Sequence, residues 1–266
     1  MSDDLLGKEY ISKWTHNAKQ HFDDGDYEWL CDFIQQCFPD GACKRILELG
    51  CGAGCSTLVF LLRDYQVVSI DMNNEAIVYT DALIREHDYT SEIKTKDEPD
   101  YSQTDALLWR KDIIHEWGLV NALVKQQANV NPIHVIVLCN PGGNLSTQIT
   151  PEELDLLRTG GFSEEEICKN LRKGFTDLLH KWALIYAACA LSRSTGIPLL
   201  IVERETENEV KSTLAQISKD ATMVIAKSSS KPIKNAPNGG TFLMNTMDTT
   251  GQLCWGAALY IPVDFQ

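Results

Sequence analysis

Apolar residues recur along the chain in short continuous runs, and helical patterns separate most of them. Seven runs have the length and composition of β-strands: residues 45–49, 66–70, 106–109, 133–139, 198–203, 221–226 and 255–263. Continuous apolar runs, rather than alternating ones, are typical of strands buried on both faces of a parallel sheet. Helical periodicity marks residues 56–64, 74–87, 113–127, 164–194 and 207–219. This alternation predicts an α/β fold with helices on both faces of the sheet.

Three parts of the chain depart from this simple alternation. A turn-rich stretch, rather than a helix, separates the last two strand runs, which predicts an antiparallel C-terminal hairpin at one edge of the sheet. Residues 1–40 form a helical segment before the first strand, and residues 142–180 form an insertion after the fourth. We expect one domain over residues 1–266, in which both segments cover the carboxyl edge, where open α/β sheets bind ligands.

A glycine-rich loop follows the first strand, in the segment 45–57, RILELGCGAGCST. The strand carries Glu48, and an apolar helix pattern follows the loop. Glycine at alternate positions lets the backbone turn tightly and approach a ligand closely. A dinucleotide-binding fingerprint would need glycine at Cys55, and a P-loop would need a lysine before the helix. The segment has neither.

The spacing E-x-G-x-G-x-G, from Glu48 to Gly54, resembles the first motif of the class I S-adenosylmethionine (SAM) dependent methyltransferases. The resemblance implies a Rossmann-like, seven-stranded and mostly parallel sheet with a C-terminal antiparallel hairpin. It also implies that the loop packs against the methionine part of SAM, and that the Glu48 carboxylate organises the loop and the amino group of the cofactor. The cofactor contacts expected here are Glu48, Gly50, Cys51, Gly52 and Gly54.

An acidic residue follows the second strand. Asp71 comes about 20 residues beyond Gly50, the distance at which an acid accepts hydrogen bonds from ribose hydroxyls. A carboxylate suits this position because it accepts from both hydroxyls of one ribose. The neighbouring Met72 is also an expected cofactor contact. The alternative interpretation is that Asp71 caps the helix that begins near Asn74.

Another acidic residue, Asp112, follows the third strand. By resemblance, its carboxylate would accept a hydrogen bond from the adenine amino group, and Ile113 would supply a backbone contact. Asp105 and Asp100 are nearby alternatives for the same role.

Asn140 and Pro141 follow the fourth strand, where the family places the group nearest the transferring methyl. Amine-directed members often carry Asn/Asp-Pro-Pro-aromatic there, and the Asn side chain and a backbone carbonyl accept hydrogen bonds from the target NH₂. The resemblance implies that Asn140 and Pro141 are catalytic and that Asn140 also borders the cofactor. Gly142 and Gly143 do not match the second half, so no ring is present there to stack on a flipped base. A plain turn is the other interpretation, because N-P and G-G are both strong loop signals.

The N-terminal segment carries aromatic residues and histidines. Tyr10, Trp14 and Tyr27 are expected to line the acceptor site as part of a lid, although aromatic residues at helical spacing are more often core residues. His16 and His21 are candidate bases in the same segment.

The composition of the chain limits the kinds of partner that it can bind. Lys and Arg number 24 against 37 Asp and Glu, a net charge of −13, so the chain repels phosphate backbones and a nucleic-acid partner is unlikely on sequence grounds. No signal peptide and no apolar run long enough for a membrane span is visible in the sequence. The nine cysteines include no C-x-x-C pair and no zinc-site spacing, which predicts free thiols, no metal and a cytoplasmic location.

The sequence therefore predicts an enzyme that transfers a methyl group from SAM to a nitrogen of a small molecule or peptide and releases S-adenosylhomocysteine. Three alternatives stay open at this point. They are an O-methyltransferase acting on a small molecule, a catalytically silent SAM-binding partner subunit, and an aminopropyl transferase that uses decarboxylated SAM.

Overall fold

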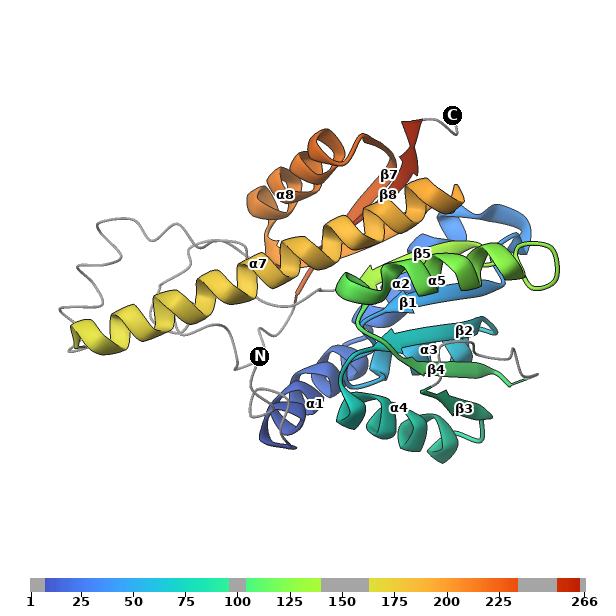
Figure 1. Cartoon of the computed structure of the whole chain (residues 1–266), viewed down its shortest axis with the longest axis horizontal. Helices are drawn as coiled ribbons and strands as arrows, with labels where there is room; N and C mark the ends of the chain where they lie inside the picture. Colours follow the sequence, from blue (N-terminus) through green and yellow to red (C-terminus); the bar gives the residue numbers. More distant parts are fainter. Residues whose placement is uncertain (1–7, 96–103, 140–162, 234–252, 264–266) are drawn as a thin grey trace.

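The strands form one eight-stranded sheet in a computed structural model that describes residues 8–95, 104–139, 163–233 and 253–263 (Figure 1). Its order is β3-β4-β2-β1-β5-β6-β8-β7. The strands are β1 (Arg45–Leu49), β2 (Gln66–Asp71), β3 (Ser91–Lys94), β4 (Ala106–Arg110), β5 (Val135–Cys139), β6 (Leu199–Thr206), β7 (Met223–Pro232) and β8 (Leu253–Pro262). β8 runs antiparallel to both of its neighbours, and the other pairs are parallel.

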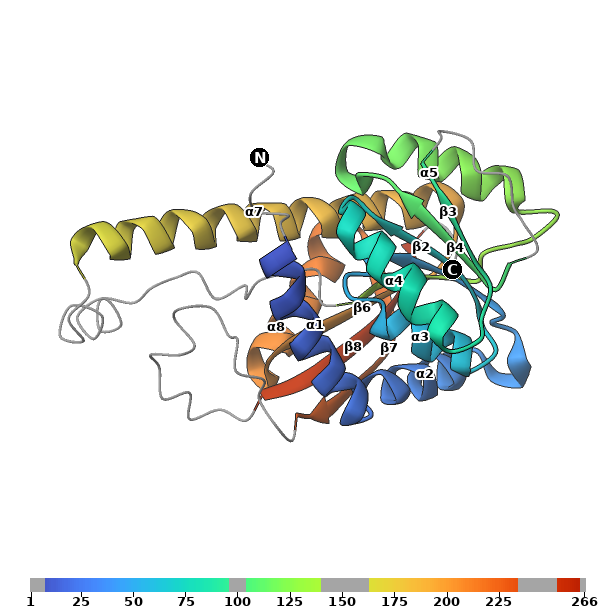
Figure 2. The same ribbon diagram turned by 90° about the horizontal axis from the view of Figure 1, so that it is seen from below.

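Helices cover both faces of the sheet (Figures 1 and 2). The helices are α1 (Lys8–Asp23), α2 (Asp26–Cys37), α3 (Cys55–Leu62), α4 (Asn74–Glu86), α5 (Ile113–Gln127), α7 (Glu164–Thr195), α8 (Glu207–Asp220) and the short 3-10 helix η2 (Pro39–Gly41). Buried residues of α5, α7 and α8 pack on one face, and those of α2, α3 and α4 pack on the other. The α/β architecture predicted from the alternation of strand and helix patterns is confirmed.

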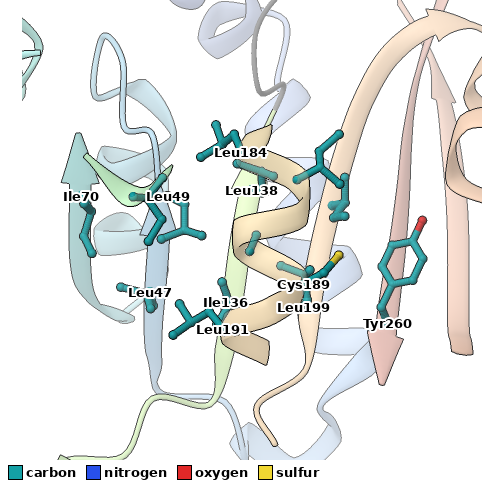
Figure 3. Close-up of a cluster of buried hydrophobic side chains, with 14 of the residues drawn as sticks. Leu47, Leu49, Ile70, Ile136, Leu138, Leu184, Cys189, Leu191, Leu199 and Tyr260 are labelled. Carbon is teal, nitrogen blue, oxygen red and sulfur yellow. The ribbon is translucent and has the colours of Figure 1, made fainter. Parts of the chain in front are cut away.

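The central strands are buried on both faces, as their unbroken apolar runs predict. All five residues of β1 are buried, and so are the first four of β5. Figure 3 shows part of the core beneath α7, where Leu184 and Leu191 lie over Ile136 and Leu138 of β5. Burial of this kind contributes about 1.5–3 kcal/mol for each large apolar side chain, so it fixes α7 against the sheet.

The sheet has one strand more than the seven expected. The additional strand, β3, lies at the edge and pairs in parallel with β4. Three of its four residues, SEIK, are polar, as suits a strand that is paired along one edge and only partly covered on its faces. The expected C-terminal hairpin is confirmed, with β8 between β6 and β7.

Helix α7 is one continuous helix of 32 residues. The second part of the predicted insertion, residues 164–180, is therefore the N-terminal half of this helix, and residues 142–162 lie outside the described ranges. Both views show this half extending beyond the sheet, away from the other helices (Figures 1 and 2). Among the helices in the described ranges, none has the length and apolar character needed to cross a membrane.

Candidate functional site

The loop between β1 and α3 owes its shape to three glycines with left-handed backbone angles. Gly50, Gly52 and Gly54 have φ values of +82°, +52° and +74°, a region that side-chain-bearing residues rarely adopt. The Gly50 N–H donates to the carbonyl oxygen of Ile70 at 2.6 Å, and the Gly54 N–H donates to that of Cys51 at 2.8 Å. The loop is thus held against the end of β2 and turns directly into α3.

Two of these glycines are required for different reasons. A Cβ atom at Gly54 would lie 2.7 Å from Thr80 Oγ1 and 3.0 Å from Thr80 Cα, so this position must stay small for α4 to pack. A Cβ atom at Gly50 would meet no atom within 4 Å. The backbone at Gly50 therefore faces open space, the kind of surface on which a ligand lies close to the main chain.

Glu48 organises the loop from inside the protein. Its carboxylate accepts hydrogen bonds from three hydroxyl groups: Ser56, Thr57 at 2.5 Å and Ser69 at 2.7 Å. Burial raises the pKa of Glu48, and these hydrogen bonds oppose the shift. The side chain has no exposed surface, so it ties β1, β2 and α3 together. The geometry accounts for the loop-organising half of the expected role, and a contact with the cofactor amino group stays a prediction.

Asp71 joins the end of β2 to the glycine loop. Its Oδ2 accepts from the Gly52 N–H at 3.0 Å, and its Oδ1 accepts from the Asn73 N–H at 2.8 Å. Burial raises the pKa of Asp71, and the two backbone hydrogen bonds oppose this. The cap of α4 is Asn73, whose side chain accepts from the Glu75 N–H at 3.0 Å. The capping alternative for Asp71 is therefore wrong, and its remaining lone pairs can accept from a ligand.

Two other expected cofactor contacts, Cys51 and Met72, differ in how far they are buried. Cys51 is buried, and its sulfur accepts from Thr80 Oγ1 at 3.6 Å. Met72 is partly exposed directly after Asp71. Only the backbone of Cys51 thus lies on the loop surface, since its side chain packs into the core.

Asp112 caps α5. Its Oδ1 accepts from the backbone N–H of Ile114 at 2.9 Å, and its Oδ2 lies 2.6 Å from His115 Nδ1. Burial alone would raise the pKa of Asp112, but the hydrogen bonds from His115 and from the helix N–H groups lower it. Ile113 is buried in the core, so only its backbone is available for the adenine contact that the resemblance implies.

Of the two alternatives to Asp112, the structure describes one. Asp105 precedes β4, at the opposite edge of the sheet from the glycine loop, and accepts from the Thr90 N–H at 2.8 Å. Asp100 lies outside the described residues. Of the candidates that the structure describes, Asp112 is the one at the carboxyl edge.

Helix α1 ends at this edge. It contacts α3 and α4, and its His21 contacts Arg204 near the end of β6. The helix therefore lies between α3, which follows the glycine loop, and the end of β6, and the lid role expected of this segment stays a prediction.

A buried polar cluster fastens α1 and α2 to the C-terminal strands. Asp26 accepts from His21 Nδ1 at 2.7 Å, from Trp255 Nε1 at 3.0 Å and from Lys231 Nζ at 2.7 Å. Arg204 Nη1 lies 2.9 Å from His21 Nε2. Because a guanidinium only donates, Nε2 must accept, and the proton sits on Nδ1 facing Asp26. Both ring nitrogens of His21 are thus engaged, which favours a structural role over the role of a base.

The predicted substrate-side residues are only partly described. Tyr27 lies beside His21 and Trp255, with ring centroids 6.5 and 6.4 Å away, and burial raises its pKa well above the usual range. Its ring therefore packs among the side chains that join α2 to β8. The side chains of Tyr10 and Trp14, and all of Asn140 and Pro141, lie outside the described residues.

The register of β1 and β5 places the carboxyl end of β5 beside the glycine loop. Glu48 pairs with Val137, so Cys139 at the end of β5 is level with Gly50. Neighbouring strands lie about 4.8 Å apart. The chain that continues from Cys139 therefore starts one strand away from the loop.

The sequence analysis missed two buried polar groups. The first is the cluster around Asp26, in which Asp26 and its partner Trp255 are 229 positions apart. The second is the ion pair between Lys181 and Glu203, 2.7 Å apart and fully buried. The sequence offers one signal for this ion pair: Lys181 and Glu203 each stand at one end of an otherwise apolar run. No group of three metal-binding side chains occurs within the ranges that the structure describes.

Comparison with known proteins gives one family match. Residues 28–129 match the D12 class N6 adenine-specific DNA methyltransferases. This region contains the glycine loop, Asp71 and Asp112. A search of curated protein sequences found no match.

Solved structures with a similar arrangement include two methyltransferases. One is the magnesium protoporphyrin IX methyltransferase of Synechocystis PCC 6803 with bound SAM, at 10% identity and a TM-score of 0.49, covering 96% of this chain and 93% of that one. The other is the N-methyltransferase NodS from Bradyrhizobium japonicum WM9 in complex with S-adenosylhomocysteine, at 13% identity and a TM-score of 0.49, covering 96% and 97%.

Three features of this site agree with the cofactor that the sequence predicts. The glycine loop leaves open space at Gly50, Asp71 offers carboxylate lone pairs beside it, and the family match spans both. The mostly parallel sheet with its antiparallel β8 is the fold that the sequence predicts, and residues 28–129 are similar to a family of methyltransferases.

Proposed function

We propose that this protein methylates a nitrogen of a small molecule or peptide. The observation that carries this proposal is the sequence Asn140-Pro141 directly after β5, whose last residue, Cys139, is level with Gly50 of the glycine loop. An Asn side chain at this point supplies a carbonyl oxygen that accepts from a target NH₂ and aims the nitrogen lone pair.

The cofactor would be held by the glycine loop, Asp71 and the start of α5. When bound, SAM supplies a methyl group already activated on a sulfonium. The protein therefore has to orient the acceptor and exclude water, and good orientation contributes on the order of 7–11 kcal/mol to such reactions. Helix α1, which packs against the helix that follows the loop, would exclude water from it.

A second candidate acceptor is the amino group of a nucleic-acid base. The match to N6 adenine-specific DNA methyltransferases favours it, because those enzymes also act on an exocyclic nitrogen. The net charge of −13 and the Gly142-Gly143 pair argue against it, since they disfavour a phosphate backbone and a flipped base. We therefore keep the small or peptide amine as the first choice, in a cytoplasmic protein whose eight described cysteines are all free thiols.

The test has two stages. Calorimetric titration with SAM, and with NAD as the control, should show binding of SAM alone. Formation of S-adenosylhomocysteine is then measured with amines, with alcohols of the same shape and with adenine-containing DNA. Turnover with amines supports the proposal. Turnover with DNA or with alcohols alone replaces it by the corresponding alternative, and SAM binding without any turnover indicates a silent partner subunit.

A further inference from the structure

A buried histidine joins the last turn of α1 to two other parts of the fold. His21 is 2% exposed. Its Nδ1 donates to Asp26 Oδ2 of α2 at 2.7 Å, and its Nε2 accepts from Arg204 Nη1 of β6 at 2.9 Å. Both hydrogen bonds can exist together only while the ring is neutral, because a guanidinium has no lone pair to offer.

The groups around this ring keep their charge near neutral pH. Burial alone would raise the pKa of Asp26, but its three hydrogen-bond donors and the charge of Lys231 hold it below its usual value. Burial raises the pKa of Tyr27, whose ring lies beside His21, well above the usual range. Lysine and arginine stay charged. Helices α3 and α4 contact α1, but within the described residues neither makes a hydrogen bond or ion pair with His21. Histidine is thus the one side chain of this cluster whose charge ordinarily changes between about pH 5 and 8.

A second proton on the ring would affect its two partners in opposite ways. The hydrogen bond to Asp26 would become charged at both ends, which strengthens it. At Nε2 the lone pair that Arg204 uses would be replaced by an N–H group, so two donors and two positive charges would face each other across 2.9 Å. Like charges at this distance repel strongly where water is excluded. The contact with Asp26 would therefore persist, and the contact with Arg204 would be lost.

The contact with Arg204 ties α1 to the sheet itself. In the register of β5 and β6, Val202 pairs with Cys139, so Arg204 stands beyond the described end of β5, at the carboxyl edge. The other packing partners of α1 are the helices α2, α3 and α4. Loss of this contact would leave α1 on these helices and free its last turn from β6.

We propose that His21 and Arg204 form a pH-sensitive latch, which holds α1 to the carboxyl end of β6 while His21 is neutral and opens when Nε2 takes up a proton from water. The inference goes beyond the proposed function and does not depend on it. Because α1 also contacts α3, the helix that follows the glycine loop, the latch links this end of the sheet to the acidity of the surroundings.

The test measures amide hydrogen exchange in α1 of the whole protein at about pH 7.5 and about pH 5.5, after correction for the pH dependence of exchange in an unfolded chain. His21→Gln cannot take up the proton, and Arg204→Met removes the cation that a protonated ring would face. The matched control is His16→Gln, because His16 lies on the same helix and is exposed. The fully buried strand β1 is the internal reference.

In wild type and in His16→Gln, α1 should exchange about tenfold faster at the lower pH, as the loss of one hydrogen bond to a charged group implies, while β1 stays unchanged. His21→Gln and Arg204→Met should give the same exchange in α1 at both pH values. No change in wild type, or a tenfold change that persists in either variant, would overturn the inference. An equal change in β1 would also overturn it, because the whole fold would then be opening.

If His21→Gln does not fold, the comparison rests on Arg204→Met, whose side chain replaces a partly exposed one. A second measurement follows the ring directly. The ¹⁵N NMR signal of His21 Nε2 in wild type should be that of an unprotonated nitrogen at about pH 7.5 and of a protonated one at about pH 5.5. A nitrogen that stays unprotonated at the lower pH would contradict the latch. Neither measurement uses SAM or an acceptor, so failure here leaves the proposed function untouched.

Discussion

The glycines of the loop between β1 and α3 share one backbone conformation, but their surroundings differ. Gly54 faces Thr80 of α4, whereas Gly50 faces open space. We expect Gly54→Ala to lower the free energy of unfolding by more than Gly50→Ala does, because both pay the cost of a positive φ and only Gly54→Ala adds a clash of 2.7 Å. Gly50→Ala should instead lower SAM affinity more than stability. Denaturant unfolding and calorimetry measure the two effects, and equal loss in both variants would contradict this division.

Asp71 has a different task from the neighbouring acid Glu75. We expect Asp71→Ala to weaken SAM binding by about 1–3 kcal/mol, because it removes the hydrogen bond from the Gly52 N–H and the carboxylate that is expected to accept from the ribose. Glu75→Gln, on the exposed first turn of α4, is the control and should leave SAM affinity unchanged. Calorimetry with SAM decides the point, and an unchanged affinity for Asp71→Ala would mean that another acid holds the ribose.

At the level of elements, the attachment of α1 and α2 depends on Asp26. Asp26→Asn removes the charge that Lys231, His21 and Trp255 share, so we expect a loss of about 1.5–3 kcal/mol in the free energy of unfolding. Asp32→Asn on the same helix is the control. Its partner Arg63 is partly exposed, and pairs of this kind contribute about 0–1 kcal/mol. Chemical denaturation with hydrogen exchange in α2 measures both.

The same residue gives a pH dependence with a definite sign. Burial alone would raise the pKa of Asp26, but the hydrogen bonds from His21, Lys231 and Trp255 and the charge of Lys231 hold it below its usual value of 3.8. The folded state therefore favours the ionised form, and this contribution is present above pH 3.8 and is lost as the pH falls through the lower pKa of the folded state. The stability difference between wild type and Asp26→Asn should shrink below about pH 4. A constant difference down to pH 2 would contradict this account.

Sequence patterns predict those elements whose chemistry is local. Unbroken apolar runs identify the buried strands, and the glycine spacing identifies the loop, because both signals lie within a dozen residues. The edge strand β3 was missed since its four residues, SEIK, have no apolar run. The contact between Asp26 and Trp255, and the pairing of Lys181 with Glu203, depend on how distant segments meet, which no local pattern encodes.

For the whole molecule, cofactor binding should appear as thermal stabilisation. At a SAM concentration 100 times its dissociation constant, binding adds about 2.7 kcal/mol to the free energy of unfolding. For a protein of this size we expect the melting temperature to rise by about 5–10 °C. Differential scanning fluorimetry with SAM, and with NAD as the control, measures the shift. A rise with NAD and none with SAM would contradict the assignment of the cofactor.

The position of β8 also has consequences for how the chain becomes a folded protein. β8 lies between β6 and β7, so β7 has no partner in the described sheet until β8 is in place. β8 also carries Trp255, to which Asp26 of the N-terminal helices is bonded. During synthesis from the N-terminus, α2 therefore cannot form this bond until β8, near the other end of the chain, has been made. We expect the parallel core to form first, and the closing of the sheet edge and the docking of α1 and α2 to follow as one late, cooperative step.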